Sequence, residues 1–162
     1  MKKLKVYLDT SVVSHLFADD TPGKMEDTNK LWEDFKADKY DIYISALTAE
    51  EIQKCSEPKR TLMTDKLGEI DFQVLEETDE INNLADEYVN SGVLPKKSTD
   101  DCLHMAYAVV TNCDIIISWN FKHLVNYRTI NKVKVVNTVN HYKEISIISP
   151  TMLLEGGDEN EG

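Results

Sequence analysis

The sequence predicts an α/β fold in which helices flank a central, mostly parallel sheet of about five strands. Short β-rich runs alternate with longer stretches of helical periodicity, and successive parallel strands need crossovers of that kind. The run "DIIIS" contains three consecutive isoleucines, which suit a strand covered on both faces. A chain of 162 residues has room for one core of useful size, so we expect a single domain over residues 1–152.

Five short apolar runs are expected to be strands. They are "KVYLD" (5–9), "DIYIS" (41–45), "FQVL" (72–75), "DIIIS" (114–118) and "ISIIS" (145–149). Helices are expected near 10–18, 25–38, 47–55, 58–69, 78–90 and 98–112. The segment 128–140 is ambiguous: Ile130, Val133, Val136 and Val139 recur every three residues as in a helix, whereas its valine content suits a strand.

The segment "KMEDTNKLWEDFKADKY" is amphipathic at helical spacing through Leu31, Trp32 and Phe35. The simpler interpretation is that this apolar stripe packs on the domain's own core. The alternative is a face that binds a partner, because an apolar stripe serves either purpose.

The composition limits the classes of partner. The chain carries a formal charge of −11 and is 41% apolar. Residues 153–162 contribute Glu155, Asp158, Glu159 and Glu161 and are expected to form an acidic, disordered C-terminal tail. The remainder is about seven charges negative, which argues against bulk attraction to nucleic acid or an anionic membrane. A nucleic-acid enzyme would therefore need a local basic lip.

The cysteine pattern, together with a start that fits no targeting signal, predicts a cytoplasmic protein. Cys55, Cys102 and Cys113 are odd in number and widely spaced, as expected for reduced, buried thiols. The start "MKKLKVYLDTS" has only short apolar pieces and fits neither a signal peptide nor an anchor. No apolar run approaches the ~18 residues of a membrane helix.

Polar residues that follow the expected strands are the candidates for a site, since ligands of parallel sheets gather at the carboxyl ends of the strands. Asp9 follows the first strand, Glu51 lies in the helix after the second, Asp101 begins the helix before the fourth, and Asn120 follows the fourth. Each has an ordinary structural explanation, such as helix capping for Asp9 or a turn for Asn120. Converging carboxylates repel one another, so together they favour a hard divalent cation such as Mg²⁺ or Mn²⁺.

The histidines do not compete for a metal. His15, His104, His123 and His141 are scattered, with no pair at i and i+4, so zinc ligation is not indicated. We expect these residues to be structural or to lie on the surface.

Four motifs in order resemble those of PIN domains, a family that includes the VapC-like ribonuclease toxins. They are "YLDTSVVS", "ISALTAEEI", "DDCLHMAYAV" and "IISWNFKHL", and the resemblance spans about residues 4–150. It implies a three-layer PIN-like fold and a ribonuclease that uses Mg²⁺ or Mn²⁺. It also implies two partners besides RNA, a small antitoxin protein and a second copy of the chain.

The resemblance assigns roles residue by residue. Asp9, Glu51 and Asp101 match the catalytic acids that bind metal. At the fourth metal-binding position this chain has Asn120 where the family often has aspartate, and an amide supplies an oxygen but no charge. A weaker second metal site or a single-metal enzyme is the expected result. Thr10 and Ser11 are expected to support a ligand or a metal-bound water by hydrogen bonding.

The acidic doublet Asp100 and Asp101 requires a choice between two neighbours. Ser98 and Asp101 have the spacing of a capping box, which would explain the acid structurally. Adjacent residues of a helix point about 100° apart, so both acids cannot serve one pocket equally. The motif, with leucine two places and alanine five places after the acid, selects Asp101 as the ligand and leaves Asp100 in a supporting role.

Basic residues adjacent to the motifs are candidates for binding RNA phosphates. Lys96 and Lys97 precede the acidic doublet, whereas Lys122 and Arg128 follow Asn120. A further group, Lys54, Lys59 and Arg60, follows Glu51. Ordinary solvated side chains on helix faces are the alternative for all of them.

Two other functions remain open. A PIN-like binding or regulatory module with a weakened metal site would fit Asn120 and the acidic surface. An aspartate-based phosphatase using Asp9 as a nucleophile would resemble a "DxD" pattern, and here the sequence is "DTS". The last alternative is therefore the weakest.

Overall fold

The computed structural model describes residues 2–161, with side chains as far as residue 156. Its five strands form one sheet in the order β3-β2-β1-β4-β5, and every neighbouring pair is parallel. The strands are β1 (Lys5–Leu8), β2 (Asp41–Ser45), β3 (Gln73–Leu75), β4 (Ile115–Ile117) and β5 (Ser146–Ile148). The predicted α/β fold with a parallel five-stranded sheet is confirmed.

Most of the helices fall between the strands as the sequence predicts, and one further helix follows the last strand. They are α1 (Thr10–His15), α2 (Pro22–Lys36), α3 (Ala46–Gln53), α4 (Lys59–Leu67), α5 (Asp79–Asn90), the 3₁₀ turn η1 (Lys96–Ser98), α6 (Thr99–Val110), α7 (Tyr127–Val139) and α8 (Pro150–Glu161). The ambiguous segment 128–140 is helix α7, in which Val133 and Val136 face the core. Among the described residues, no helix is both long and apolar enough to cross a membrane.

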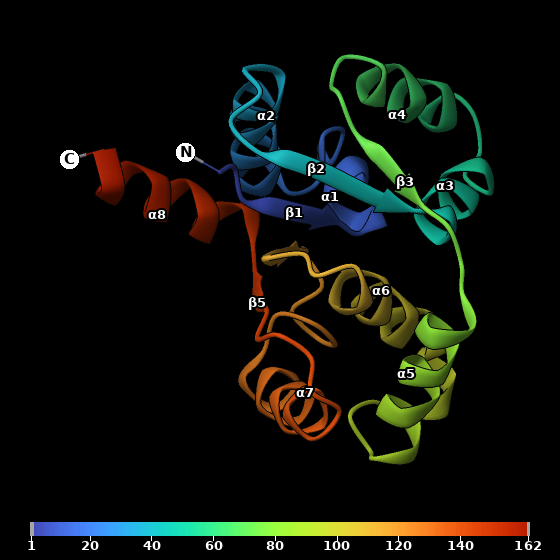
Figure 1. The fold of residues 1–162 in the computed structure, drawn as a ribbon. Helices are drawn as coiled ribbons and strands as arrows, with labels where there is room; N and C mark the ends of the chain where they lie inside the picture. The colour runs from blue at the N-terminus through green and yellow to red at the C-terminus, as the bar shows by residue number, and fades with distance from the viewer. Residues whose placement is uncertain (1, 162) are drawn as a thin grey trace.

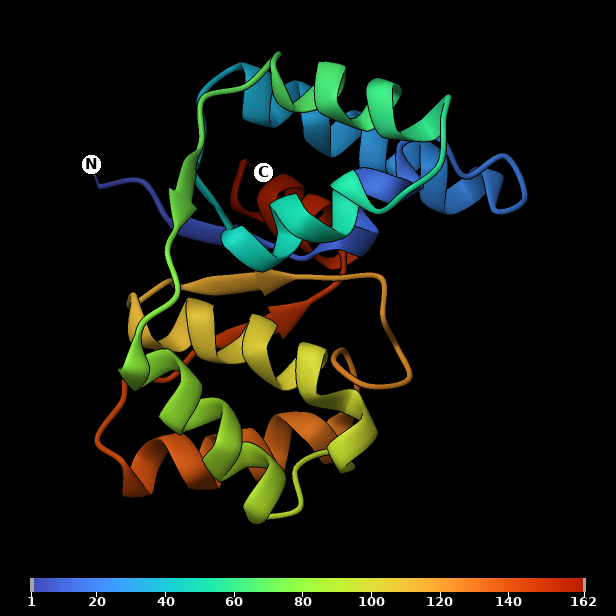
Figure 2. The ribbon, with the colours of Figure 1, turned by 90° about the vertical axis from the view of Figure 1, so that its right-hand side faces the viewer.

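Two helical layers cover the two faces of the sheet (Figures 1 and 2). Helices α5, α6 and α7 pack with Tyr7 and Ile116 on one face. Helices α1, α2, α4 and α8 contribute to the core that contains Val6, Leu8 and Ile117 on the other face. Successive residues of β1 thus alternate between two cores, because neighbouring side chains of a strand point to opposite faces.

Helix α2 packs on the domain's own core. Leu31, Trp32 and Phe35 are all buried, and the Trp32 indole N–H donates to the Lys66 carbonyl at 3.2 Å. The core-packing interpretation of this amphipathic segment is confirmed.

Helix α8 extends over most of the segment 153–162 that the sequence predicts to be a disordered tail. Leu153 is 7% exposed and belongs to the α2-side core. The hydroxyl of Thr151 donates to Asp27 at 2.5 Å, which ties the start of α8 to α2. The beginning of the predicted tail is therefore helical and packed, because the apolar pair in "TMLLEGG" anchors it; residue 162 lies outside the described residues.

The strand order creates a switch point between β1 and β4. The chain leaves β1 toward β2 and β3, then returns to place β4 on the other side of β1. Leu8 pairs with Ile117, and the Asp9 N–H donates to the Ile117 carbonyl at 3.3 Å. In open parallel sheets, ligands bind outside the carboxyl ends of strands at such a point, which is where Asp9 lies.

Candidate active site

Asp9 is a helix cap and also the most buried acid of the site. It is the N-cap of α1, and its Oδ1 accepts from the Ser11 N–H at 3.0 Å. The Ser11 hydroxyl also donates to Oδ1 at 2.5 Å, and the Ser118 hydroxyl donates to Oδ2 at 2.6 Å. With 4% of its surface exposed, Asp9 relies on these donors, because a buried carboxylate is costly without partners.

The electrostatics of Asp9 favour a cation beside it. Burial raises the pKa of Asp9, and the charge of Asp101 raises it further. The charge of His104 and the hydroxyls of Ser11 and Ser118 oppose that rise but do not cancel it. Partners on the chain therefore compensate only part of the cost of ionising Asp9, and a metal cation would supply the rest.

Glu51 turns toward the same site from α3. Its Oε1 accepts from the Thr10 hydroxyl at 2.7 Å and lies 2.7 Å from Nε2 of His104. Burial acts to raise the pKa of Glu51, but these two hydrogen bonds and the charge of His104 lower it overall. The neighbouring Glu50 is paired instead with Lys54 at 3.2 Å on the surface. The choice of Glu51 over Glu50 thus agrees with the direction of the side chain.

His104 is a buried imidazole in contact with Tyr7 and Glu51. The Tyr7 hydroxyl donates to Ser45 Oγ at 2.8 Å, so toward Nδ1 of His104, 2.6 Å away, it accepts. Nε2 must also donate, because its partner Glu51 is a carboxylate. Burial acts to lower the pKa of His104, but the hydrogen bond to Glu51 and the charges of Asp9, Glu51 and Asp101 raise it overall. Both observations favour the protonated form of the ring.

Asp101 points inward from the start of α6, whereas Asp100 is exposed. The Asp101 Oδ2 lies 2.8 Å from Nδ1 of His123, and Oδ1 accepts a long contact of 3.4 Å from the Asn120 amide. The predicted capping box is not formed, because Ser98 makes no side-chain cap. The Asp101 carboxyl is directed to the loop after β4 instead of back to its own helix.

Asn120 is connected to Asp9 through one hydroxyl. The Asn120 N–H donates to Ser118 Oγ at 2.9 Å, and that hydroxyl in turn donates to Asp9. The side-chain oxygen of Asn120 accepts from the His123 N–H at 2.9 Å. Its amide oxygen is thus occupied within its own turn, and its NH₂ group faces Asp101.

The four predicted metal residues lie in two hydrogen-bonded groups, which we together call the acid network. Asp9, Asn120 and Asp101 are linked through Ser118 and the Asn120 amide, whereas Glu51 binds Thr10 and His104. The four residues come from the ends of β1 and β4 and from the helices α3 and α6. In the part of the chain that the structure describes, no three His, Cys, Asp or Glu side chains are placed to hold an ion as a group. Each acid is turned toward a hydroxyl or imidazole partner.

The donor set nevertheless fits a hard cation. Its members offer oxygen ligands, and Mg²⁺ needs only one or two carboxylates because it keeps several waters. A carboxylate has about four acceptor positions, so the present partners leave some of them available.

Four residues of the network were missed by the sequence analysis, namely Tyr7, His104, Ser118 and His123. The signal for His104 was its position three residues after Asp101, which puts both on one face of α6. His123 stands in the same relation to Asn120. The expectation that these two histidines were only structural or superficial left out their contacts with site acids.

The candidate RNA-binding residues separate into two groups. Lys96, Lys122 and Arg128 line one hollow beside the site, and Lys97 is not among its lining residues. On the α3 and α4 side, Lys54 and Arg60 are engaged by Glu50 and Glu57.

The protein is a parallel α/β domain with acids at the switch point of its sheet. Comparison with known protein families identifies the family that has this arrangement. The PIN domain model matches residues 6–122, which is most of the chain. The protein belongs to the PIN domain family. Membership disfavours the aspartate-based phosphatase alternative. No curated protein matches the chain.

Solved structures share the fold. The crystal structure of VapBC2 from Rickettsia felis bound to a DNA fragment from their promoter gives a TM-score of 0.54 at 11% identity, covering 90% of this chain and 98% of that chain. Mycobacterium tuberculosis VapC20, a sarcin-ricin loop cleaving toxin, gives 0.54 at 16% identity, covering 73% and 92%. The fold is thus VapC-like.

Proposed function

We propose that this protein is a metal-dependent ribonuclease that hydrolyses RNA phosphodiester bonds and acts as the toxin of a toxin-antitoxin pair. The observation that carries the proposal is the grouping of Asp9, Glu51 and Asp101 from three elements, whose charges all act on His104. Ser118 binds Asp9, and His104 binds Glu51. Bringing three carboxylates close together is unfavourable unless a cation or a substrate group offsets their mutual repulsion.

The residues of the network would position the reacting groups. A Mg²⁺ or Mn²⁺ ion supplies a bound water of lowered pKa and stabilises charge on the phosphoryl oxygens. Asp9 and Asp101 would hold that ion, and Glu51 would orient the attacking water. Ser11 and Ser118 fix both oxygens of Asp9, and His104 fixes Glu51.

The comparisons support the toxin assignment. Two of the solved structures that share this fold are a VapBC2 complex and the toxin VapC20. On that ground we extend the proposal to an antitoxin protein that holds the ribonuclease inactive and to a homodimer of this chain.

An RNA cleavage assay tests the proposal. Labelled RNA is incubated with the protein and Mn²⁺ or Mg²⁺, and EDTA and Asp9→Asn serve as controls. We expect cleavage that EDTA abolishes and that Asp9→Asn lowers by a factor on the order of 100 or more. Cleavage that persists in EDTA and in Asp9→Asn alike would come from a contaminant or from another site.

A binding or regulatory module is the second candidate, and Asn120 favours it. Its amide provides no negative charge, and its oxygen is engaged by the His123 N–H. In this case the protein binds RNA in the same assay without cleaving it at any Mn²⁺ concentration.

A further inference from the structure

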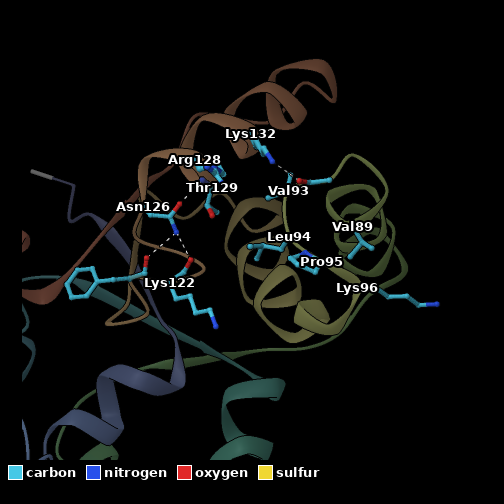
Figure 3. Close-up of a pocket in the computed structure, with 12 residues that line it drawn as sticks. Val89, Val93, Leu94, Pro95, Lys96, Lys122, Asn126, Arg128, Thr129 and Lys132 are labelled. Carbon is cyan, nitrogen blue, oxygen red and sulfur yellow. Dashed lines mark hydrogen bonds between the residues drawn. The ribbon is translucent and has the colours of Figure 1, made fainter.

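A hollow of about 770 Å³ lies between the loop after α5 and the start of α7 (Figure 3). We call it the basic groove, because its charged lining residues are Lys96, Lys122, Arg128 and Lys132, and none of its lining residues is acidic. In a chain with a net charge of −11, such a concentration of positive charge departs from the general surface.

The cations of the basic groove are not neutralised by acids. In the part of the chain that the structure describes, none of the four makes a salt bridge. Lys132 donates to the Gly92 carbonyl at 3.1 Å across the groove and keeps two further protons for a ligand. By contrast, Lys54 and Arg60 on the other flank of the site are paired with glutamates. The groove is thus the more attractive of the two flanks for an anion.

Helix α7 adds to the positive potential. Its first turn lines the groove through Arg128 and Thr129, and its N-cap Asn126 is also part of the lining. The N-terminal end of a helix carries a partial positive charge that favours anions. The charge of the side chains and the helix end therefore act together on a bound phosphate.

The loop that follows β4 connects the basic groove to the acid network. Lys122 lies between Asn120 and His123, the two residues that contact Asp101. The Asn126 amide donates to the carbonyls of Lys122 and Phe121 at 2.8 and 3.1 Å, and the Leu124 N–H donates to the Asn120 carbonyl at 3.0 Å. On the opposite wall, Lys96 belongs to η1, which leads directly into α6.

We propose that the basic groove binds the phosphate backbone of single-stranded RNA next to the bond held at the acids; this rests on the proposed ribonuclease function. Backbone phosphates match a cluster of cations that have no acidic partners. Among the apolar lining residues Val93 and Leu94 are buried, whereas Pro95 is exposed. Pro95 offers apolar contact to the face of an unpaired base, and a duplex hides that face. An acidic protein segment would match the charges but gains no advantage from the adjoining acids.

Binding in EDTA tests the groove separately from catalysis. The probe is a fluorescein-labelled single-stranded RNA of about 12 nucleotides, with the dissociation constant measured by anisotropy over a range of salt concentrations. The groove variant is Lys122→Gln with Arg128→Gln. The matched control is Lys54→Gln with Arg60→Gln, which removes the same charges from the other flank.

We expect the groove variant to bind about tenfold more weakly, with a salt slope smaller by about 1.4, since each phosphate contact on a single strand contributes about 0.7. The control should stay within about twofold of wild type. Double-stranded RNA of the same sequence should show a smaller difference between the groove variant and wild type. Thermal unfolding of each variant, with Lys122→Gln alone as a milder change, verifies that the fold is intact.

The outcomes separate the two proposals. Equal weakening by both variants, or unchanged binding by the groove variant, overturns the groove assignment, as does wild-type protein that does not bind the RNA. If the KM of Mn²⁺-dependent cleavage is unchanged in the groove variant, the groove assignment is rejected and the ribonuclease proposal is kept. Groove-dependent binding without cleavage supports the groove and removes the ribonuclease.

Discussion

The Tyr7 hydroxyl lies 2.6 Å from Nδ1 of His104, and Nε2 of the same ring lies 2.7 Å from Glu51. Tyr7 is in the central strand, His104 in α6 and Glu51 in α3, so two hydrogen bonds connect three elements. Tyr7 and His104 are 0% and 3% exposed. The buried side chains of Tyr7 and His104 therefore fix the position of Glu51 from the core of the domain.

Tyr7→Phe should destabilise the protein by about 1–3 kcal/mol, because it leaves Nδ1 of His104 buried without its hydrogen-bond partner. Urea unfolding measures this change. The comparison is Tyr142→Phe, which removes a surface hydrogen bond to Glu80 and should cost at most about 0.5 kcal/mol. Equal losses for the two variants would mean that the buried contact has no special weight.

Asp101→Asn should reduce RNA cleavage far more than Asp100→Asn. The Asp101 carboxyl faces Asn120 and His123, whereas Asp100 is exposed on the next position of α6. We expect a loss on the order of 100-fold for Asp101→Asn and less than about threefold for Asp100→Asn. Initial rates at saturating Mn²⁺ give the comparison. The reverse order would reject the assignment of Asp101.

Asn120→Asp should tighten Mn²⁺ binding by a factor on the order of ten, equivalent to about 1.4 kcal/mol. The new carboxylate would stand 3.4 Å or so from Asp101, as the amide does now, and would repel it in the absence of a cation. We therefore expect a lower melting temperature than wild type in EDTA and a larger rise on adding Mn²⁺.

Calorimetric titration with Mn²⁺ measures the affinities for this comparison directly. Absence of binding by both forms would refute the metal site. Equal affinities would show that position 120 does not face the ion.

Asp114 should stabilise the protein at neutral pH and lose that effect in acid. Its carboxyl accepts from Lys143 at 2.6 Å and from the Lys5 N–H at 2.8 Å. These hydrogen bonds, the one from Lys143 first, hold the pKa of Asp114 below its ordinary value. A lowered folded-state pKa gives stability above the unfolded value of about 4, and protonation removes that stability as the pH falls further.

Asp114→Asn should therefore cost about 1 kcal/mol in urea unfolding at pH 6, and the difference from wild type should shrink near pH 3. Asp20→Asn, at an exposed loop position, serves as the control and should change little at either pH. A difference that grows in acid would contradict the assigned direction.

Much of the fold followed from the sequence, because each element carries its own local signal. All five strands lie within the apolar runs that predict them, and "DIIIS" is a central strand buried on both faces. The start of α8 was missed, because glycine and acids follow it closely in the sequence, whereas Leu153 and the hydrogen bond from Thr151 to Asp27 fix it to the rest of the domain. Its stability comes from packing, which local composition does not reveal.

Part of the site also followed from the sequence. The choice of Glu51 over Glu50 and of Asp101 over Asp100 agrees with the directions of these side chains in the structure. Their roles as metal ligands stay predictions. The histidines were underestimated, since a lone histidine carries no signal until its partner on another element is known.

The sequence by itself determined the five strands, the helices from residue 10 to residue 112, the PIN motifs and the acids that they contain, because these depend on short-range periodicity and spacing. Only the tertiary structure decided which partner holds each acid. Ser118 reaches Asp9 across 109 residues of chain, and His104 reaches Glu51 across 53. Those contacts arise from the parallel sheet, which brings the ends of β1 and β4 together while α3 and α6 converge beside them.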